Sequence, residues 1–495
     1  MKRWFLLAAL TLLCGSARAT IDYSVSLQQP EEHLFRVTMS VPQVAGDLHL
    51  QMPAWNATYQ IRDFASRIQN VRVAGESGAF VPIRKLDKLT WVAQGSGALR
   101  VMYEIYWDDP GPFSSQLNAD HAFLNFAMVL MYSPARRSED VTVRFTNVPA
   151  GWKTALALKP GAQPNSYVAA NYDALVDAPA ELGTFEESRF EASGAKIRVA
   201  IHGGSYPREE LLDMLRRVVT YQTTLMREVP FEEFTFIYHF GSGGGGMEHA
   251  NSTAISSSGA RSPNGVSAHE FFHLWNVKRI RPQSLEPVDY TKENWTRSLW
   301  FAEGVTSTYG SYTLVRSGLW TPQEFYNDLA DEFSVLQARS ARLWKSVEEA
   351  SLDAWHEKYP HYNRPAYSIS YYNKGQILGV LLDILIRDAT QNRRSLDDVV
   401  RDLNVTYAHK GLFYGESAAI RASAEKIAGR SFAEFFERYV AGTDELPYAE
   451  ILKRAGLDVS VSGTGRNSYS ISESPNATAL ARRIREGLVK GTTDQ

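Results

Sequence analysis

Two histidines flank a glutamate in a pattern that can bind a metal ion. The run His269-Glu270-Phe271-Phe272-His273 places the histidines four positions apart. On a helix such residues lie on one face, about 6 Å apart, so both imidazoles can bind the same zinc ion. Glu270 would lie beside the metal, within reach of a zinc-bound water. The pattern therefore predicts a hydrolytic zinc site with His269 and His273 as ligands and Glu270 as the general base.

A third protein ligand is predicted in the next helical stretch, residues 299–306. Glu303 is the only acid in this otherwise apolar and small-residue run. An unpaired buried carboxylate costs several kcal/mol, so a glutamate here needs a cation. We expect Glu303 to complete a site for one zinc ion per chain, with one position left open for water. The alternative is a first-turn glutamate held by backbone amides.

The helix that carries the histidines needs a start and an end. Pro263-Asn264-Gly265 supplies a start that puts both histidines inside the helix, whereas the capping box Ser267–Glu270 would start it later. The basic run 278–282 ends in proline, which suits a helix C-terminus. We interpret that run as structural and expect it to close the helix.

The rest of the chain predicts an α+β protein. Residues 20–190 contain alternating runs at 34–41, 48–52, 99–105 and 141–145, which favour an N-terminal β-sandwich domain. Strands are expected at 196–201 and 234–238, and helices at 208–227, 377–386 and 479–488. Capping boxes are expected at 321–324 and 431–434. The other histidines, His121, His202 and His239 among them, show no ligand spacing, although His239 and His249 lie nearer the motif.

Composition and the N-terminus limit the classes of function. The chain has 495 residues and a net charge of -3, which gives no electrostatic case for binding nucleic acid. Residues 1–19 resemble a signal peptide with a cleavage site at Ala17-Arg18-Ala19, so we expect a secreted or periplasmic protein. The only cysteine, Cys14, lies inside this segment, so a thiolate metal site is not expected. No later apolar run is long enough for a stable membrane span.

Two motifs resemble a known family. Residues 245–253 read G-G-M-E-H-A-N-S-T, and residues 269–282 read H-E-F-F-H-L-W-N-V-K-R-I-R-P. Both are similar to the glycyl-aminopeptidase family of gluzincin zinc metallopeptidases, metallopeptidase family sixty-one. The first is also akin to the G-x-M-E-N motif of the larger aminopeptidase N group. The resemblance covers about residues 20–457 and is strongest over 234–310.

This resemblance implies a fold and several roles. It implies a thermolysin-like, mainly helical zinc peptidase domain at 191–457 after the β-domain at 20–190. Members usually carry a C-terminal PDZ domain, and residues 458–495 are too few for one, so we expect it to be absent or truncated. Residues 371–375 resemble the Y-x-K-G segment whose tyrosine stabilises the oxyanion, with Tyr372 preferred and Tyr371 as the alternative.

The resemblance also implies how a peptide is bound. Glu248 would pair with the free α-amino group of a peptide, and Gly245 and Gly246 would let the peptide backbone approach closely. The expected activity is removal of N-terminal glycine or alanine from peptide substrates. A thermolysin-like endopeptidase with a structural Glu248 is the first alternative. A catalytically silent binding or scaffold protein is the second.

Overall fold

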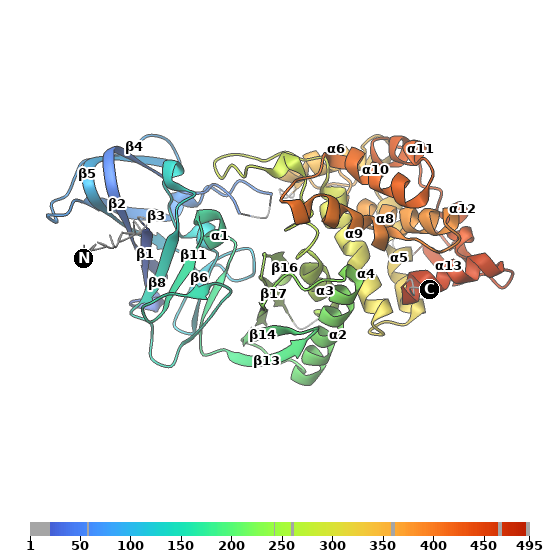
Figure 1. Cartoon of the computed structure of the whole chain (residues 1–495), viewed down its shortest axis with the longest axis horizontal. Helices are drawn as coiled ribbons and strands as arrows, with labels where there is room; N and C mark the ends of the chain where they lie inside the picture. Colours follow the sequence, from blue (N-terminus) through green and yellow to red (C-terminus); the bar gives the residue numbers. More distant parts are fainter. Residues whose placement is uncertain are drawn as a thin grey trace, which may run out of the picture.

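The structure is a computed structural model and describes residues 20–56, 59–241, 243–258, 262–357, 362–463 and 468–491. A β-rich N-terminal part lies at one end of the molecule and a mainly helical part at the other (Figure 1). The predicted α+β class is confirmed. The signal peptide expected at residues 1–19 lies outside the described residues. Within the part of the chain that the structure describes, no helix is long and apolar enough to cross a membrane.

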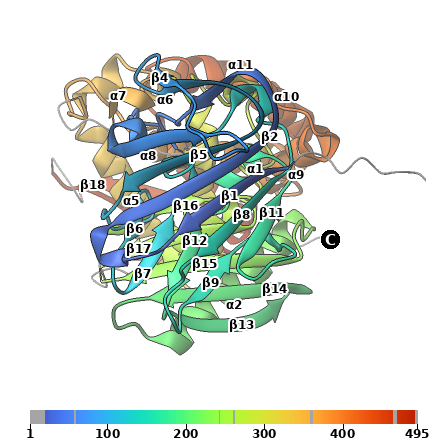
Figure 2. The ribbon, with the colours of Figure 1, turned by 90° about the vertical axis from the view of Figure 1, so that its left-hand side faces the viewer.

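The N-terminal part contains two sheets whose apolar faces share one core. The first comprises β10 (Lys159–Pro160), β11 (Ser166–Ala169), β8 (Val141–Thr146), β1 (Ile21–Ser26), β2 (Leu34–Gln51), β5 (Thr90–Tyr106), β3 (Ile68–Ala74) and β4 (Ile83–Lys85). The second comprises β6 (Gln116–Leu117), β7 (His121–Leu124), β12 (Ala180–Gly183) and β9 (Lys153–Leu156). In Figure 2 these strands lie in front of the helices. The alternation predicted for residues 34–41 buries every second side chain of β2.

A five-stranded sheet joins the two ends of the molecule. Its strands, in spatial order, are β13 (Glu186–Ala192), β14 (Ala195–His202), β15 (Glu233–Phe240), β17 (Ser252–Ser257) and β16 (Gly244–Glu248). The three central strands are parallel, and the two edge strands are antiparallel to their neighbours. The sheet thus begins at Glu186, a few residues before the domain boundary predicted at 190. Helix α2 (Arg208–Met226) connects β14 to β15, as the parallel pairing requires.

The helical part is built around α8 (Tyr371–Ala389), almost all of whose residues are buried. Helices α4, α5, α9, α10, α12 and α13 all contact it. The main helices are α3 (Asn264–Phe272), α4 (Thr306–Arg316), α5 (Pro322–Gln337), α6 (Val347–Leu352), α7 (Ala354–Glu357), α9 (Leu396–Thr406), α10 (Glu416–Ala428) and α12 (Tyr448–Arg454). Short α1 (Tyr172–Val176) belongs to the N-terminal part. The helix predicted over residues 377–386 is confirmed within α8.

One of the two predicted capping boxes forms. Thr321 caps α5, and Glu324 closes the box by accepting from the Thr321 backbone N–H. The box predicted at 431–434 is wrong. The hydroxyl of Ser431 donates to Glu425 and accepts from the Ala433 backbone N–H, so the short helix α11 (Ala433–Phe435) begins later.

Residues 457–463 and 468–491 pack onto the helical part. Strands β18 (Leu457–Val461) and β19 (Tyr469–Glu473) form an antiparallel pair, and β19 lies along α5. Helix α13 (Ala479–Lys490) buries Ile484 and Leu488 against α4 and α8. The helix predicted over residues 479–488 is therefore confirmed.

Candidate active site

His273 is the C-cap of helix α3 and does not lie inside it as expected, whereas the helix carries His269 and starts where the sequence predicts, directly after Pro263. It ends at Phe272, so the expectation that the basic run 278–282 closes it is wrong. The carbonyl of Asn276 accepts hydrogen bonds from His273 Nδ1 and the Thr306 hydroxyl, and the chain leaves the helical path. The basic residues are still structural, because Arg279 donates to the Leu274 and Pro230 carbonyls.

Three side chains predicted as ligands converge on one point. His269 Nε2 and His273 Nε2 lie 2.9 Å apart, and Glu303 Oε2 lies 3.5 Å and 3.2 Å from them. His273 and Glu303 are almost completely buried. The His269 pKa is lowered by burial and by the neighbouring His273, which favours the neutral ring that binds metal.

The hydrogen bonds of the two imidazoles determine which nitrogen faces the site. His273 Nδ1 donates to the Asn276 carbonyl at 2.7 Å, so in the neutral ring its Nε2 carries the lone pair. Ser307 donates its hydroxyl proton to the Glu303 carbonyl and therefore accepts from His269 Nδ1 at 3.2 Å. Two Nε2 lone pairs and a carboxylate thus face each other. This donor set fits a divalent cation such as zinc, with each imidazole held by a hydrogen bond on its far nitrogen.

Glu303 reaches the site because two glycines let two helical segments touch. It lies in the π-helical turn η6 (Trp300–Val305), which continues directly into α4. A Cβ on Gly304 would lie 2.5 Å from the Gly375 Cα, and one on Gly375 would clash with the Trp300 carbonyl. The close approach of η6 and α8 places Glu303 beside the start of α8, where Tyr371 and Tyr372 lie.

Glu270 lies between α3 and the edge strand β16. A Cβ on Gly246 would overlap the Glu270 side chain, and its Oε1 is 2.6 Å from that position. Burial raises the pKa of Glu270 well above its ordinary value, and the carboxylates of Glu248 and Glu303 add to the rise. Its buried Oε2 forms no hydrogen bond with the described residues. The side chain is therefore a confined carboxylate with affinity for a proton.

A cavity of about 70 Å³ connects these groups to Glu248 and Tyr372. It is lined by Tyr59, Phe113, Gly246, Met247, Glu248, His269, Glu270, His273, Glu303 and Tyr372. Oxygens of Glu248 and Glu270 and a nitrogen of His273 all lie within 4.8 Å of one another. Tyr371 is almost completely buried and does not line the cavity. Gly245 has a left-handed φ of 103°, and a Cβ added to it would lie 3.0 Å from the Phe113 ring.

Three residues around this cavity were not predicted from the sequence. Tyr59 and Phe113 come from the N-terminal part, and nothing distinguishes them among 24 tyrosines and 23 phenylalanines. Asp177, which follows α1, accepts from Lys278 Nζ at 2.6 Å and from the Ala250 backbone N–H at 3.0 Å. It also lies 3.3 Å from His249 Nδ1. Asp177 therefore anchors the turn directly after Glu248.

The chain is similar to a known protein family over much of its length. A model of the M61 glycyl aminopeptidase family matches residues 263–378, and a model of the peptidase M61 N-terminal domain matches residues 22–184. The two matches together span more than half of the chain and contain His269, Glu270, His273, Glu303 and Tyr372. None of the curated proteins compared with the sequence matches it.

Two solved structures are similar in fold. An aminopeptidase N family protein from Idiomarina loihiensis has a TM-score of 0.85 and 26% identity, over 89% of this chain and 80% of the other. An M1 zinc metallopeptidase from Deinococcus radiodurans has a TM-score of 0.53 and 16% identity, over 87% of this chain and 94% of the other. The second likeness concerns the fold alone.

Proposed function

Because the chain belongs to the M61 glycyl aminopeptidase family, we propose that it is a zinc aminopeptidase that removes glycine or alanine from the N-termini of peptides. His269, His273 and Glu303 would hold the zinc ion. When bound there, zinc supplies a Lewis acid that polarises the scissile carbonyl and makes the attacking water more acidic.

Glu270 is proposed as the general base. Its carboxylate accepts a proton from the attacking water and later delivers that proton to the departing amine. A raised pKa suits this shuttle, because the group must bind the proton and then release it. The Gly246 backbone leaves no room for the side chain to turn away.

Tyr372 is proposed as the donor to the carbonyl oxygen as it becomes negatively charged. It lines the cavity with His269 and Glu303, and its ring centroid lies 6.1 Å from that of His269. Burial and the nearby Glu303 carboxylate raise its pKa, which keeps the phenol protonated and able to donate. Tyr371 is the weaker candidate because it lies behind the cavity wall.

One observation carries the aminopeptidase proposal over the endopeptidase alternative. Glu248 lies within 4.8 Å of the base and a ligand, at the end of an edge strand. Among the described residues, no lysine or arginine forms an ion pair with it. A second carboxylate beside Glu270 needs a cation, and the free α-amino group of a substrate supplies one. Capture of that group would place the first peptide bond at the metal.

The preference for a small first residue is supported by the size of the cavity. At about 70 Å³ it leaves little space, and Tyr59 and Phe113 of the N-terminal part close its outer side. Tyr59 is buried, and Arg62 donates to the Phe113 carbonyl and ties the two segments together. A bulky side chain would collide with these aromatic rings.

The test uses one alanine-rich peptide with a free and with an acetylated N-terminus. We expect the zinc-loaded protein to cleave only the free form, one residue from the end. Glu248→Gln should lower kcat/KM for the free peptide by about 10- to 100-fold, because it removes a charge-assisted contact of about 1.5–3 kcal/mol. Glu31→Gln, an exposed acid in a distant turn, is the matched control.

Two results would redirect the proposal. Equal cleavage of both peptides would make the protein an endopeptidase and return Glu248 to a structural role. No cleavage of either peptide by the zinc-loaded protein would favour the alternative of a catalytically silent binding or scaffold protein.

We also propose export from the cytoplasm with cleavage near Ala19, on the strength of the N-terminal segment alone. Determining the N-terminal residue of the protein purified from its native source tests this, with Thr20 expected.

A further inference from the structure

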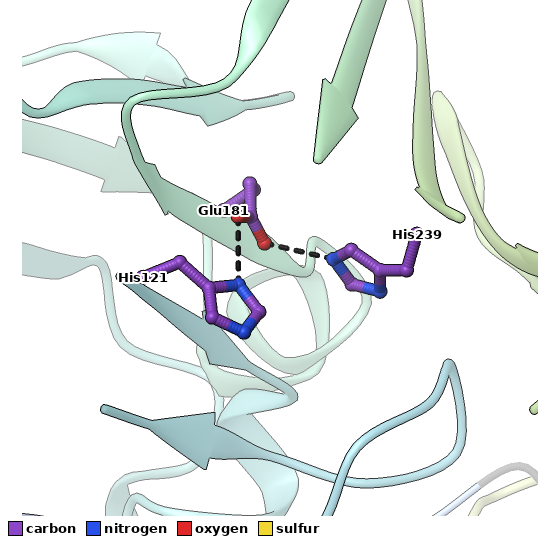
Figure 3. Close-up of side chains that lie close together, drawn as sticks. All are labelled: His121, Glu181 and His239. Carbon is purple, nitrogen blue, oxygen red and sulfur yellow. Dashed lines mark hydrogen bonds and ion pairs between the residues drawn. The ribbon is translucent and has the colours of Figure 1, made fainter. Parts of the chain in front are cut away.

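A second group of histidines lies where the N-terminal part meets the five-stranded sheet. His121 and Glu181 belong to β7 and β12 of the N-terminal part. His202 and His239 are paired in register at the ends of the parallel strands β14 and β15. Figure 3 shows His121 and His239 approaching the Glu181 carboxylate from two sides. The group therefore joins four strands from two sheets.

The Glu181 carboxylate is the centre of this group. It is completely buried, and each of its oxygens meets one imidazole nitrogen at 2.9 Å, His121 Nδ1 and His239 Nε2. His202 Nδ1 lies 3.7 Å from Oε1. A buried, ionised carboxylate requires a cation within the group.

A chain of hydrogen bonds determines the tautomer of His121. The Gln116 amide nitrogen donates to Asp108 at 2.9 Å, which directs the amide oxygen toward His121 Nε2 at 3.1 Å. His121 Nε2 must therefore carry the proton, and in the neutral ring His121 Nδ1 presents its lone pair to Glu181. A lone pair and a carboxylate oxygen 2.9 Å apart need a proton or a metal ion between them. The amide that holds the far nitrogen is a typical support for a metal-binding imidazole.

The arrangement favours a metal ion over a proton. His121 Nδ1, His239 Nε2 and a Glu181 oxygen all lie within 4.8 Å of one another, like the three ligands of the active site. The rings of His121 and His202 are stacked with centroids 3.8 Å apart, so two imidazolium ions there would repel each other. Neutral imidazoles with one carboxylate form a nitrogen-rich donor set that suits zinc.

We propose that His121, Glu181 and His239 form a second zinc site, separate from the active site. One ligand atom from each of these three side chains lies within 4.8 Å of the others, which is close enough for all three to reach a single zinc ion after a modest adjustment of the side chains. Because its three ligands are buried between two sheets, the site is structural rather than catalytic. Its ion would fix the N-terminal part, which supplies Tyr59 and Phe113, against the catalytic sheet.

The test counts metal ions in the full chain. Protein stripped with a chelator and dialysed against buffered zinc is analysed by mass spectrometry of the metal and by protein concentration. We expect two zinc ions per chain for the unaltered protein, one for Glu303→Ala and one for His239→Ala. His49→Ala, an exposed histidine on β2, is the matched control and should keep two.

A thermal readout separates this site from the active site. In the Glu303→Ala protein, added zinc should raise the Tm, and the rise should vanish in the double variant with His239→Ala. If His239→Ala does not fold, Glu181→Gln takes its place. One zinc ion in the unaltered protein, or no zinc in folded Glu303→Ala, would overturn the proposal. Two ions retained by a folded cluster variant would overturn it as well.

Discussion

At the scale of single residues, the active site depends on how little space surrounds Glu270. The carboxylate is confined by the Gly246 backbone, and any side chain at that position would overlap it. The same strand presents Glu248 two residues later, so one edge strand contacts the proposed base and carries the acid that we propose for the substrate amine. Glycine at 246 is therefore part of the catalytic geometry, although it has no reactive group.

Replacing this glycine tests the point. We expect Gly246→Ala to lower kcat by 10-fold or more with zinc still bound, because the added Cβ must displace Glu270. The neighbouring Gly244→Ala is the matched control, since a Cβ there meets nothing within 4 Å. Steady-state kinetics and zinc content are the measurements. Equal activity of the two variants would mean that the position of Glu270 is not restricted by β16.

At the scale of elements, the third ligand is positioned by the contact between η6 and α8. Gly304 and Gly375 meet at this contact, and they allow Glu303 on one element to lie beside Tyr372 on the other. Asn276 also holds η6 in place, because its side-chain amide donates to the Phe301 carbonyl and to the Thr306 hydroxyl. Gly304, directly after Glu303, and Gly375, three residues after Tyr372, thus form one packing contact.

A methyl group at this contact should force the two elements apart. We expect Gly304→Ala to lower the free energy of unfolding by about 1–3 kcal/mol through overpacking, and to weaken zinc binding because Glu303 moves. Gly265→Ala in α3 is the control, because a Cβ there meets nothing within 4 Å and alanine favours helix by up to about 1 kcal/mol. Denaturant unfolding and zinc titration check both variants. Unchanged zinc affinity in Gly304→Ala would contradict the assigned role.

At the scale of the whole molecule, the N-terminal part completes the active site. It supplies Tyr59 and Phe113 to the cavity, and Asp177 to the turn after Glu248. Trp55 donates to the Asp289 carbonyl and packs against Trp355 with centroids 5.0 Å apart, which adds a second area of contact. The cavity wall is therefore formed by both parts together.

The Asp177 link gives a prediction with a defined pH dependence. Although burial opposes it, Lys278 and His249 lower the Asp177 pKa, so the stabilisation is present at neutral pH and lost as the pH falls below the ordinary value of 3.8. We expect Asp177→Asn to destabilise the protein by about 1–3 kcal/mol at pH 7, because the Asp177–Lys278 pair is largely buried but still partly screened by water. The difference should shrink below pH 4. Unfolding measured against pH is the test, with the exposed Asp47→Asn as control.

The same variant should also affect substrate binding. A less firmly held turn after Glu248 should raise KM more than it lowers kcat, because Asp177 positions the amine-binding acid and does not touch the reacting atoms. A fall in kcat with KM unchanged would mean that Asp177 acts on the base or the ligands instead.

Local patterns were enough to predict much of this protein. The spacing of His269 and His273, the isolated Glu303 and the alternation along β2 are short-range features, so each is readable from neighbouring residues. The helix end was misjudged because the Asn276 carbonyl bonds with His273 and Thr306, and Thr306 lies thirty residues further along the chain. The capping box at Ser431 failed for the same kind of reason, a competing contact with Glu425.

Only the tertiary structure decided what comes together from distant strands. His121, Glu181, His202 and His239 span more than a hundred residues, and none is spaced like a ligand. Glu181 is a lone acid between Ala180 and Leu182 in a buried strand, the same signal that identified Glu303, but its partners lie on three other strands. Sequence by itself determined the catalytic motif and its chemistry, because those ligands share one helix turn and one neighbouring helix. Sheet pairing and the joining of the two parts decided the cavity wall and the second histidine group, because nonlocal contacts leave no fixed period in a sequence.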